Sequence, residues 1–180
     1  GEYFAAARDE ADRDWKVIPW LATSWSQPDA RTWRFRLREG VKFHDGSLLT
    51  ADDVVFSVER ALSPGSQMKV SLQGVEKAVK VDALTVDLAM REPNPVLLSH
   101  LTQYRIMSRA WAPRHGVQRP QDFKAREDTY ASRHANGTGA FRVKERQPDV
   151  RTVLAAHADW WGHKAGMNEG NLTEVVMLPI

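Results

Sequence analysis

The feature that most constrains the fold is a strict alternation of apolar and basic side chains over Thr32–Arg38 (TWRFRLR). Trp33, Phe35 and Leu37 occupy every second position, and arginines stand between and after them. Successive side chains of a strand point to opposite faces, so this pattern predicts a strand with one buried and one charged face. Burial of each large apolar side chain contributes ~1.5–3 kcal/mol, and we therefore expect these rings to lie in a core.

The residues after this strand predict further core contacts and then a tight turn. Val41 and Phe43 continue the alternation as far as Asp45-Gly46, which predicts a second, short strand. Asp-Gly is a favoured turn dipeptide, because Gly accepts a positive φ and Asp hydrogen-bonds its own backbone. We expect Val41 and Phe43 in the core and Asp45 and Gly46 in the turn.

A helix is predicted from Thr50 to Leu62, where apolar residues recur at helical spacing. Thr50 is a favourable N-cap, and Asp52 and Asp53 follow where the helix dipole favours negative charge. The two carboxylates could instead serve acid/base chemistry. Because adjacent helical residues point in different directions, capping is the favoured interpretation.

The rest of the chain predicts short elements of both types. In chain order these are a helix-compatible stretch over 2–15, a connector over 19–25, a hairpin over 78–90, a short helix after Asn94-Pro95 that buries Val96, Leu97 and Leu101, a loop over 112–135 with one short helix near 121–132, a turn over 136–139, and strands at 140–144, 153–156 and 173–178. This order favours an α+β fold, with a small mixed or antiparallel sheet and flanking helices, over regular βαβ winding.

Several classes of chemistry find no support in these residues. Cys is absent, which excludes disulfides, thiolate metal sites and Cys nucleophiles. The six His show no close paired spacing, so a metal site at His44-Asp45 is disfavoured. Gly137-Thr-Gly139 is too short for a phosphate-binding loop and predicts a turn. No acyl-transfer motif occurs, and we expect no enzyme, no metal and no cofactor.

The charge layout is uneven but does not indicate a nucleic-acid surface. Residues 101–150 carry ten Lys and Arg against five Asp and Glu, which could suit nucleic acid or an anionic membrane. These arginines are scattered, and the rings and guanidinium groups of Thr32–Arg38 lie on opposite faces, so base stacking is disfavoured. No apolar run approaches the ~20 residues that span a bilayer.

Three segments together resemble the family 5 extracellular solute-binding proteins, the peptide- and nickel-binding subunits of bacterial ABC importers. PWLATSW (19–25) and, seven residues later, Thr32–Leu62 are similar to the family's N-terminal signature. Asn136–Glu145 (NGTGAFRVKE) resembles its Gly-Thr-Gly turn and strand. Ala155–Gly166 resembles its aromatic-Trp-Gly element, with Trp160 where Tyr is more usual.

The resemblance implies a class II periplasmic binding protein, in which hinge closure traps a ligand between two lobes. Such proteins have several hundred residues, so we expect these 180 residues to be an N-terminal part. Residues 1–135 would form the small N-terminal subdomain, and residues 136–180 would begin the larger first lobe, with the second lobe absent. The start at Gly1 and the absence of a signal peptide then suggest a piece of an exported, periplasmic protein.

The implied function is delivery of a peptide or related small solute to the membrane permease of an ABC importer. The alternative is the solute-sensing domain of a cytoplasmic transcriptional regulator with the same fold. Which solute is carried stays open among dipeptides, oligopeptides, glutathione, a nickel chelate and sugars. With one wall of a cleft, this chain should bind its ligand weakly or not at all at micromolar concentrations.

The resemblance also implies where ligand contacts lie. In the family, the segment after the short helix approaches the cleft, and here that segment is Leu101–Trp111. Arg105 is the candidate charge partner for an anionic group such as a carboxylate. Tyr104 and Trp111 are candidates for an aromatic wall. A surface salt bridge for Arg105 and local packing for Trp111 are the structural alternatives.

The signature residues are expected to be structural and to bind no ligand. They are Trp33, Phe35, Val41, Phe43, Asp45, Gly46, Thr50, Gly137 and Gly139.

Overall fold

The computed structural model describes Phe4, residues 17–167 and residues 171–179. The stretch over 2–15 expected to be helix-compatible lies, apart from Phe4, outside the described residues. The strands are β1 Ala22–Asp29, β2 Thr32–Leu37, β3 Val75–Asp82, β4 Thr85–Met90, β5 Phe141–Gln147, β6 Arg151–Ala156 and β7 Glu174–Met177. The α-helices are α1 Ala51–Leu62, α2 Leu97–Leu101, α3 Trp111–Arg114 and α4 Trp161–Lys164, and the 3-10 helices are η1 Gln67–Leu72 and η2 Tyr130–Ser132. The combination of antiparallel sheets and few helices confirms the predicted α+β class.

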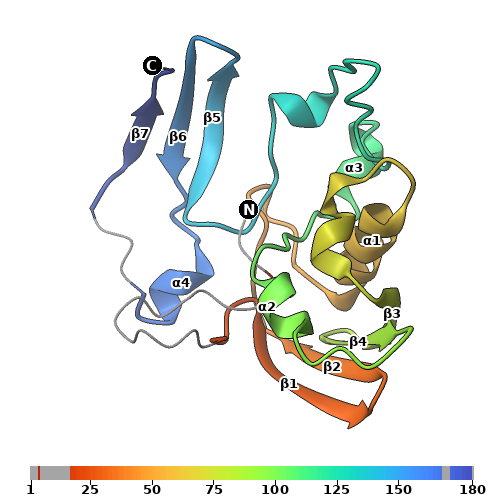
Figure 1. The fold of residues 1–180 in the computed structure, drawn as a ribbon. Helices are drawn as coiled ribbons and strands as arrows, with labels where there is room; N and C mark the ends of the chain where they lie inside the picture. The colour runs from red at the N-terminus through yellow and green to blue at the C-terminus, as the bar shows by residue number, and fades with distance from the viewer. Residues whose placement is uncertain (1–3, 5–16, 168–170, 180) are drawn as a thin grey trace.

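Two separate antiparallel sheets organise the chain (Figure 1). The first has the strand order β1-β2-β4-β3, and α1 packs against it through β3 and β4. The second has the order β5-β6-β7 and stands at the other end of the molecule, above α4 in the view of Figure 1.

The alternating segment forms the centre of the first sheet, as predicted. Phe35 in β2 pairs with Val86 in β4, and both side chains are fully buried. Trp33 pairs with Leu88 in the same register, and these two side chains are also buried. Phe4 completes this core, with its ring centroid 5.1 Å from that of Phe35.

The arginine face of β2 is held by acids and hydroxyls of the neighbouring β3–β4 hairpin. Arg34 Nε and Nη2 donate to the two carboxylate oxygens of Asp87, each at 2.8 Å. Arg36 Nη1 donates to Thr85 Oγ1 at 3.0 Å. The charged side of the strand is therefore engaged in local pairs.

Helix α1 begins as the sequence predicts. Thr50 is the N-cap, and Asp53 closes a capping box, because its Oδ2 accepts a hydrogen bond from the Thr50 amide at 2.8 Å. The turn before it also forms: Gly46 has φ +84°, a conformation that favours glycine, and Asp45 Oδ1 accepts from the Ser47 amide at 3.0 Å.

Four expectations about local structure were wrong. The supposed connector over 19–25 lies largely in β1, whose extended backbone pairs with β2 from Ala22 to Asp29. The Val41–Phe43 stretch forms only a single bridge, Lys42 to Leu48, because the chain turns at Gly40, whose φ is +72°. Val96, expected to be buried, is 53% exposed because the helix begins one residue later.

The fourth wrong expectation concerns the loop over 112–135. A helix was expected near 121–132, but the structure has only the short 3-10 helix η2 there. The Asp122 carboxylate accepts from the Lys124 and Ala125 amides, so it closes a turn where the helix would run. A short helix, α3, forms instead at the edge of this loop and was missed, as were η1 and α4.

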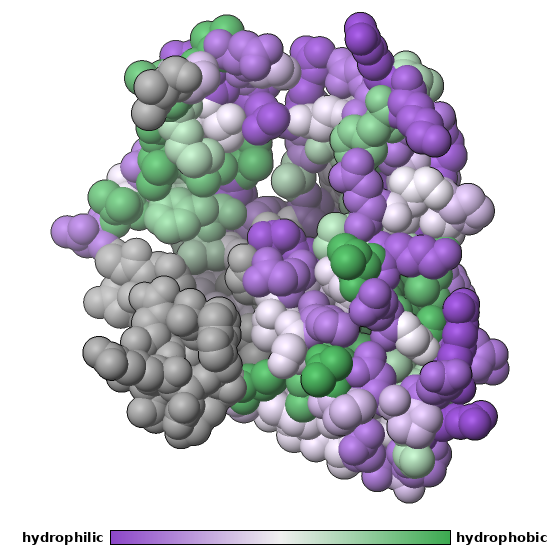
Figure 2. All heavy atoms as spheres, in the orientation of Figure 1, coloured by the Kyte–Doolittle hydropathy of each residue, from purple (hydrophilic) through white to green (hydrophobic). Residues whose placement is uncertain are grey.

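The second sheet exposes much more apolar surface than the first. Val176 and Met177 in β7 are about half exposed, at 52% and 49%, and Leu178 is 68% exposed. Figure 2 shows apolar residues gathered over this sheet, with a hollow between it and the part of the molecule that carries α3.

One polar cluster joins the two parts of the chain. His44 Nε2 lies 3.0 Å from the carbonyl oxygen of Gly139, and His157 Nδ1 lies 3.3 Å from the same oxygen. The Gly137 amide donates to His44 Nδ1 at 3.2 Å, which leaves Nε2 to carry the proton of a neutral ring. The imidazoles therefore hold residues 137–139, where the chain passes from one sheet to the other.

Candidate functional site

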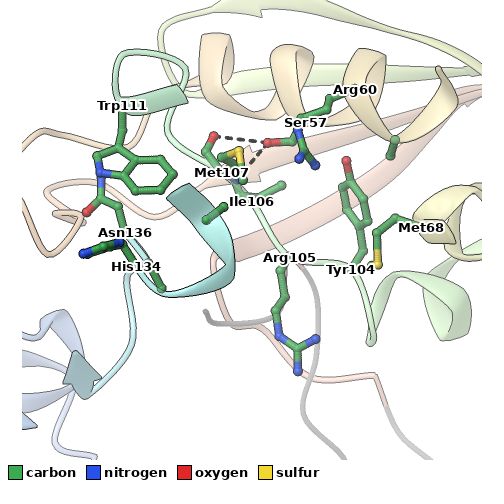
Figure 3. Close-up of a pocket in the computed structure, with 14 residues that line it drawn as sticks. Ser57, Arg60, Met68, Tyr104, Arg105, Ile106, Met107, Trp111, His134 and Asn136 are labelled. Atoms are coloured by element: carbon green, nitrogen blue, oxygen red, sulfur yellow. Dashed lines mark hydrogen bonds between the residues drawn. The ribbon is translucent and has the colours of Figure 1, made fainter. Parts of the chain in front are cut away.

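A pocket of about 260 Å³ lies between α1, the segment 104–111 and the loop 131–137 (Figure 3). It contains all three residues that the sequence nominated for ligand binding: Tyr104, Arg105 and Trp111. Its other lining residues are Ser57, Arg60, Ala61, Met68, Ile106, Met107, Ala131, His134, Ala135, Asn136 and Gly137.

Helix α1 holds the 104–111 segment in place through polar residues on one face. Asp53 Oδ1 accepts a hydrogen bond from the Arg109 amide at 2.8 Å. Ser57 Oγ accepts from the Met107 amide at 2.9 Å and donates within its own helix to the Asp53 carbonyl at 2.7 Å. The pocket wall is thus built on the helix that the sequence predicted most clearly.

Asp53 therefore does more than the capping role assigned from sequence. One carboxylate oxygen caps the helix, and the other anchors the backbone beside the pocket. Burial raises the pKa of Asp53, against the effect of the amides of Arg109 and Thr50 that donate to it. Asp52 instead faces cations, with its Oδ2 2.7 Å from Lys80 Nζ.

Arg60 is the strongest feature that the sequence reasoning missed. Its Nε donates to the Val117 carbonyl at 3.1 Å and its Nη2 to the Arg119 carbonyl at 3.1 Å. Burial lowers the pKa of this guanidinium, and within the described part of the chain no carboxylate pairs with it. A signal was available: Asp53, Ser57 and Arg60 recur at helical spacing, which places them on one face.

Two buried polar atoms in the pocket wall have no hydrogen-bond partner among the described residues. These are the hydroxyl of Tyr104, a residue only 2% exposed, and Nδ2 of Asn136, which is 9% exposed. Burial raises the pKa of Tyr104, so its hydroxyl keeps its proton and can act as a donor. In Figure 3 the Tyr104 ring is directed toward α1, on the side of Ser57 and Arg60.

The three predicted ligand residues differ in their settings. Arg105 is exposed, and Figure 3 draws its guanidinium at the lower edge of the pocket, on the side away from α1. Trp111 is 8% exposed and packs on His115, with ring centroids 4.8 Å apart. Tyr130 lies between His115 and His134 in a parallel stack, at 4.1 and 3.9 Å.

The charges that line the pocket share one sign. Arg60, Arg105 and His134 are its ionisable groups besides Tyr104, and no Asp or Glu of the described chain lines it. Apolar side chains of Met68, Ile106 and others form the remainder. Chemically, the pocket suits a small group that combines negative charge with apolar surface.

Of the residues expected to be structural, Gly137 is part of the pocket lining and the others lie outside it. Trp33, Phe35, Val41 and Phe43 are all buried in the main core. Gly137 and Gly139 are engaged through their backbones by His44. Burial lowers the pKa of His44 to about 4, so the ring is neutral at pH 7.

Neither a metal-binding cluster nor a membrane-spanning helix occurs among the described residues. They hold no group of three or more His, Cys, Asp or Glu placed to bind a metal ion. They also include no helix long and apolar enough to cross a membrane.

Comparison with known proteins places these features in a family. The model of "Bacterial extracellular solute-binding proteins, family 5 Middle" matches residues 16–180. The dipeptide-binding protein of Escherichia coli is 31% identical over 171 residues, covering 83% of this chain and 31% of that protein. The nickel-binding periplasmic protein of the same organism is 29% identical over 160 residues, covering 87% of this chain and 29% of that protein.

Structural comparison gives the same result for the fold. NikZ from Campylobacter jejuni, solved in complex with Ni(L-His), superposes with a TM-score of 0.80 at 19% identity, covering 99% of this chain and 34% of that one. The chain spans about a third of the length of these relatives. The chain belongs to the bacterial extracellular solute-binding proteins of family 5.

Proposed function

We propose that this chain is part of a periplasmic protein that captures a peptide or related small solute and delivers it to the permease of an ABC importer. The family match over residues 16–180 supports the class of activity, because the matched relatives are named as binding proteins for dipeptides and for nickel. Nothing in the family points to catalysis.

The observation that carries the proposal is the pocket beside α1. It gathers Tyr104, Arg105 and Trp111, which the resemblance alone nominated, into one cavity with no acidic residue among its described lining. Sequence reasoning gave Arg105 the role of partner for an anionic ligand group, and Tyr104 and Trp111 that of an aromatic wall. Their shared location is consistent with those roles.

The proposed organisation has two parts. Residues 1–135 form a small subdomain and residues 136–180 begin a larger lobe. The separate hydrogen bonding of the two sheets supports a division near the 136–140 crossover. In this proposal the solute is enclosed when a second lobe closes over the pocket, since affinity in such clefts comes from burying most of the ligand.

The test is to purify the product of the complete reading frame and identify co-purifying small molecules by mass spectrometry after denaturation. We expect a peptide or related solute near one equivalent, released from a protein in the periplasmic fraction. A protein found in the cytoplasm that shifts labelled DNA would contradict the proposal and support the regulator alternative. The comparisons do not favour that alternative, although one regulator is among the relatives.

A further inference from the structure

Arg60 is an unusual feature of the pocket, because a half-buried guanidinium normally lies beside a carboxylate. Here it donates hydrogen bonds to two backbone carbonyls, of Val117 and Arg119, which leave the positive charge uncompensated. Those two bonds use Nε and one hydrogen of Nη2, so further donors of the planar group are still available. An anion that entered the pocket would supply the missing charge.

A second observation points independently to a ligand. Tyr104 and Asn136 each bury a hydrogen-bond donor that has no partner among the described residues, and both residues line the same pocket as Arg60. A buried donor left unpaired costs roughly 1–3 kcal/mol, so natural folds seldom keep one without a use. Two such donors in one pocket beside an uncompensated cation indicate a site for an acceptor-rich group.

The apolar lining restricts what else the ligand carries. Met68, Ile106 and Met107 border the pocket, and no Asp or Glu of the described chain lies among its lining residues to receive an ammonium group. A hydrated inorganic anion would gain nothing from these side chains. The lining therefore favours an organic carboxylate with an apolar substituent next to it.

We propose that this pocket is a carboxylate subsite in which Arg60, supported by the hydroxyl of Tyr104, holds the acid group of the solute. Arg105 then acts at the mouth, where it attracts the anion. This inference rests on the proposed function and refines it: it assigns the ligand an acid group and an apolar side chain, and it moves the primary charge contact from Arg105 to helix α1.

The test is an NMR titration of the 180-residue chain with N-acetyl-leucine and, separately, with the neutral N-acetyl-leucine amide. We expect saturable millimolar shifts of the Arg60 Nε–H and the Met107 amide with the acid, and at least tenfold weaker binding of the amide. Arg60→Gln should weaken binding of the acid tenfold or more. Arg114→Gln, which removes an exposed arginine of α3 outside the pocket, should leave it unchanged.

Tyr104→Phe separates binding from stability. Loss of an unpaired buried hydroxyl should leave the urea midpoint unchanged or higher, while affinity for the acid falls about fivefold. Arg60→Lys is a second variant for the case that Arg60→Gln does not fold. It keeps the positive charge but loses the planar pair of donors, so it should bind the acid with intermediate affinity.

Equal affinity for acid and amide, or a folded Arg60→Gln variant that binds like wild type, would overturn the subsite. Neither outcome tests the proposed function. That function is tested separately, by identifying the solute that co-purifies with the complete protein. A carboxylate titration that succeeds while no solute co-purifies would leave the subsite standing and remove the transport role.

Discussion

The two sheets differ in how completely they bury their apolar side chains. In the first, Phe35 and Val86 are fully buried beneath α1 and its neighbours. In the second, Val176 and Met177 are about half exposed, and Val153 is the one residue of β5–β7 that is buried. Because burial of apolar area is the main stabilising contribution, the free energy of unfolding should reside chiefly in the first sheet and its helix.

This comparison also explains where the pocket lies. Its wall is fixed by the hydrogen bonds that Asp53 and Ser57 on α1 accept from the Arg109 and Met107 amides, so it belongs to the better buried part. The loop 131–137 closes it from the other side and leads directly into β5. The site therefore combines a rigid wall with a connection to the less buried sheet.

The largest expected effect tests the core of the first sheet. Phe35→Ala should lower the free energy of unfolding by about 3–5 kcal/mol, because it leaves a cavity where the ring packs on Phe4. Urea denaturation followed by circular dichroism measures this. Val176→Ala in the second sheet is the matched control, and it should cost under about 0.5 kcal/mol. Similar costs for the two variants would contradict the assigned difference between the sheets.

A second large effect is expected at α4, beneath the second sheet. A Cβ added at Gly162 would lie 2.2 Å from the Trp160 ring, so Gly162→Ala must displace a buried indole. We expect a loss of roughly 1–3 kcal/mol and a change in near-ultraviolet circular dichroism. Ala165→Ser, at an exposed position next to α4, should change neither. A Gly162→Ala protein as stable as wild type would argue against this packing.

The crossover between the sheets should make stability depend on pH. The pKa of His44 is lowered to about 4 in the folded chain and is near 6.5 when unfolded. The unfolded state therefore binds the proton first, and stability is full above about pH 6.5 and falls as the pH drops toward 4. After allowance for solvent screening, the loss is on the order of 1–2 kcal/mol.

Chemical denaturation between pH 4 and 8 measures this loss, and His44→Gln should flatten that part of the profile. Charged groups near the pair also contribute: Arg142 disfavours protonation of both imidazoles, while Asp159 favours it at His157. His115→Gln, in the aromatic stack by Trp111, is the control and should keep the slope. If His44→Gln leaves the pH dependence of stability unchanged, groups other than His44 are responsible for it.

The smallest expected effects are at ion pairs. Asp87→Asn should lower stability slightly but measurably, because it weakens the two-point pair that Asp87 forms with Arg34 in the first sheet. Glu174→Gln, which removes the exposed pair with Lys144 in the second sheet, should cost close to nothing. Thermal unfolding at low and high salt measures both effects. A larger loss of stability for Glu174→Gln than for Asp87→Asn would contradict the assigned difference between the sheets.

Sequence reasoning succeeded where one local rule determines the structure. The alternation of Thr32–Arg38, the cap at Thr50 and the Asp45-Gly46 turn each follow from backbone geometry and side-chain chemistry within a few residues. It failed for β1, whose strand is made by pairing with β2 and carries no strict alternation of its own. Its failure at 121–132 came from a side chain that closes a turn, at Asp122.

The site was predicted only in part, for the same physical reason. The resemblance nominated the segment that contains Tyr104, Arg105 and Trp111, which the fold gathers in one pocket. Arg60 and Asn136 come from distant positions in the chain, and their importance depends on burial and on missing partners, which no local pattern encodes. The helical spacing of Asp53, Ser57 and Arg60 was a usable signal, but of the three only Asp53 was interpreted, as a capping residue.

The proposed capture of a small anionic solute is tested most directly by isothermal titration calorimetry on the product of the complete reading frame. Peptides with a free C-terminal carboxylate would be compared with their C-terminal amides, after bound solute has been removed. We predict one saturable site per chain for the carboxylates and at least tenfold weaker binding of the amides. A folded protein that shows no preference for the carboxylate would contradict it.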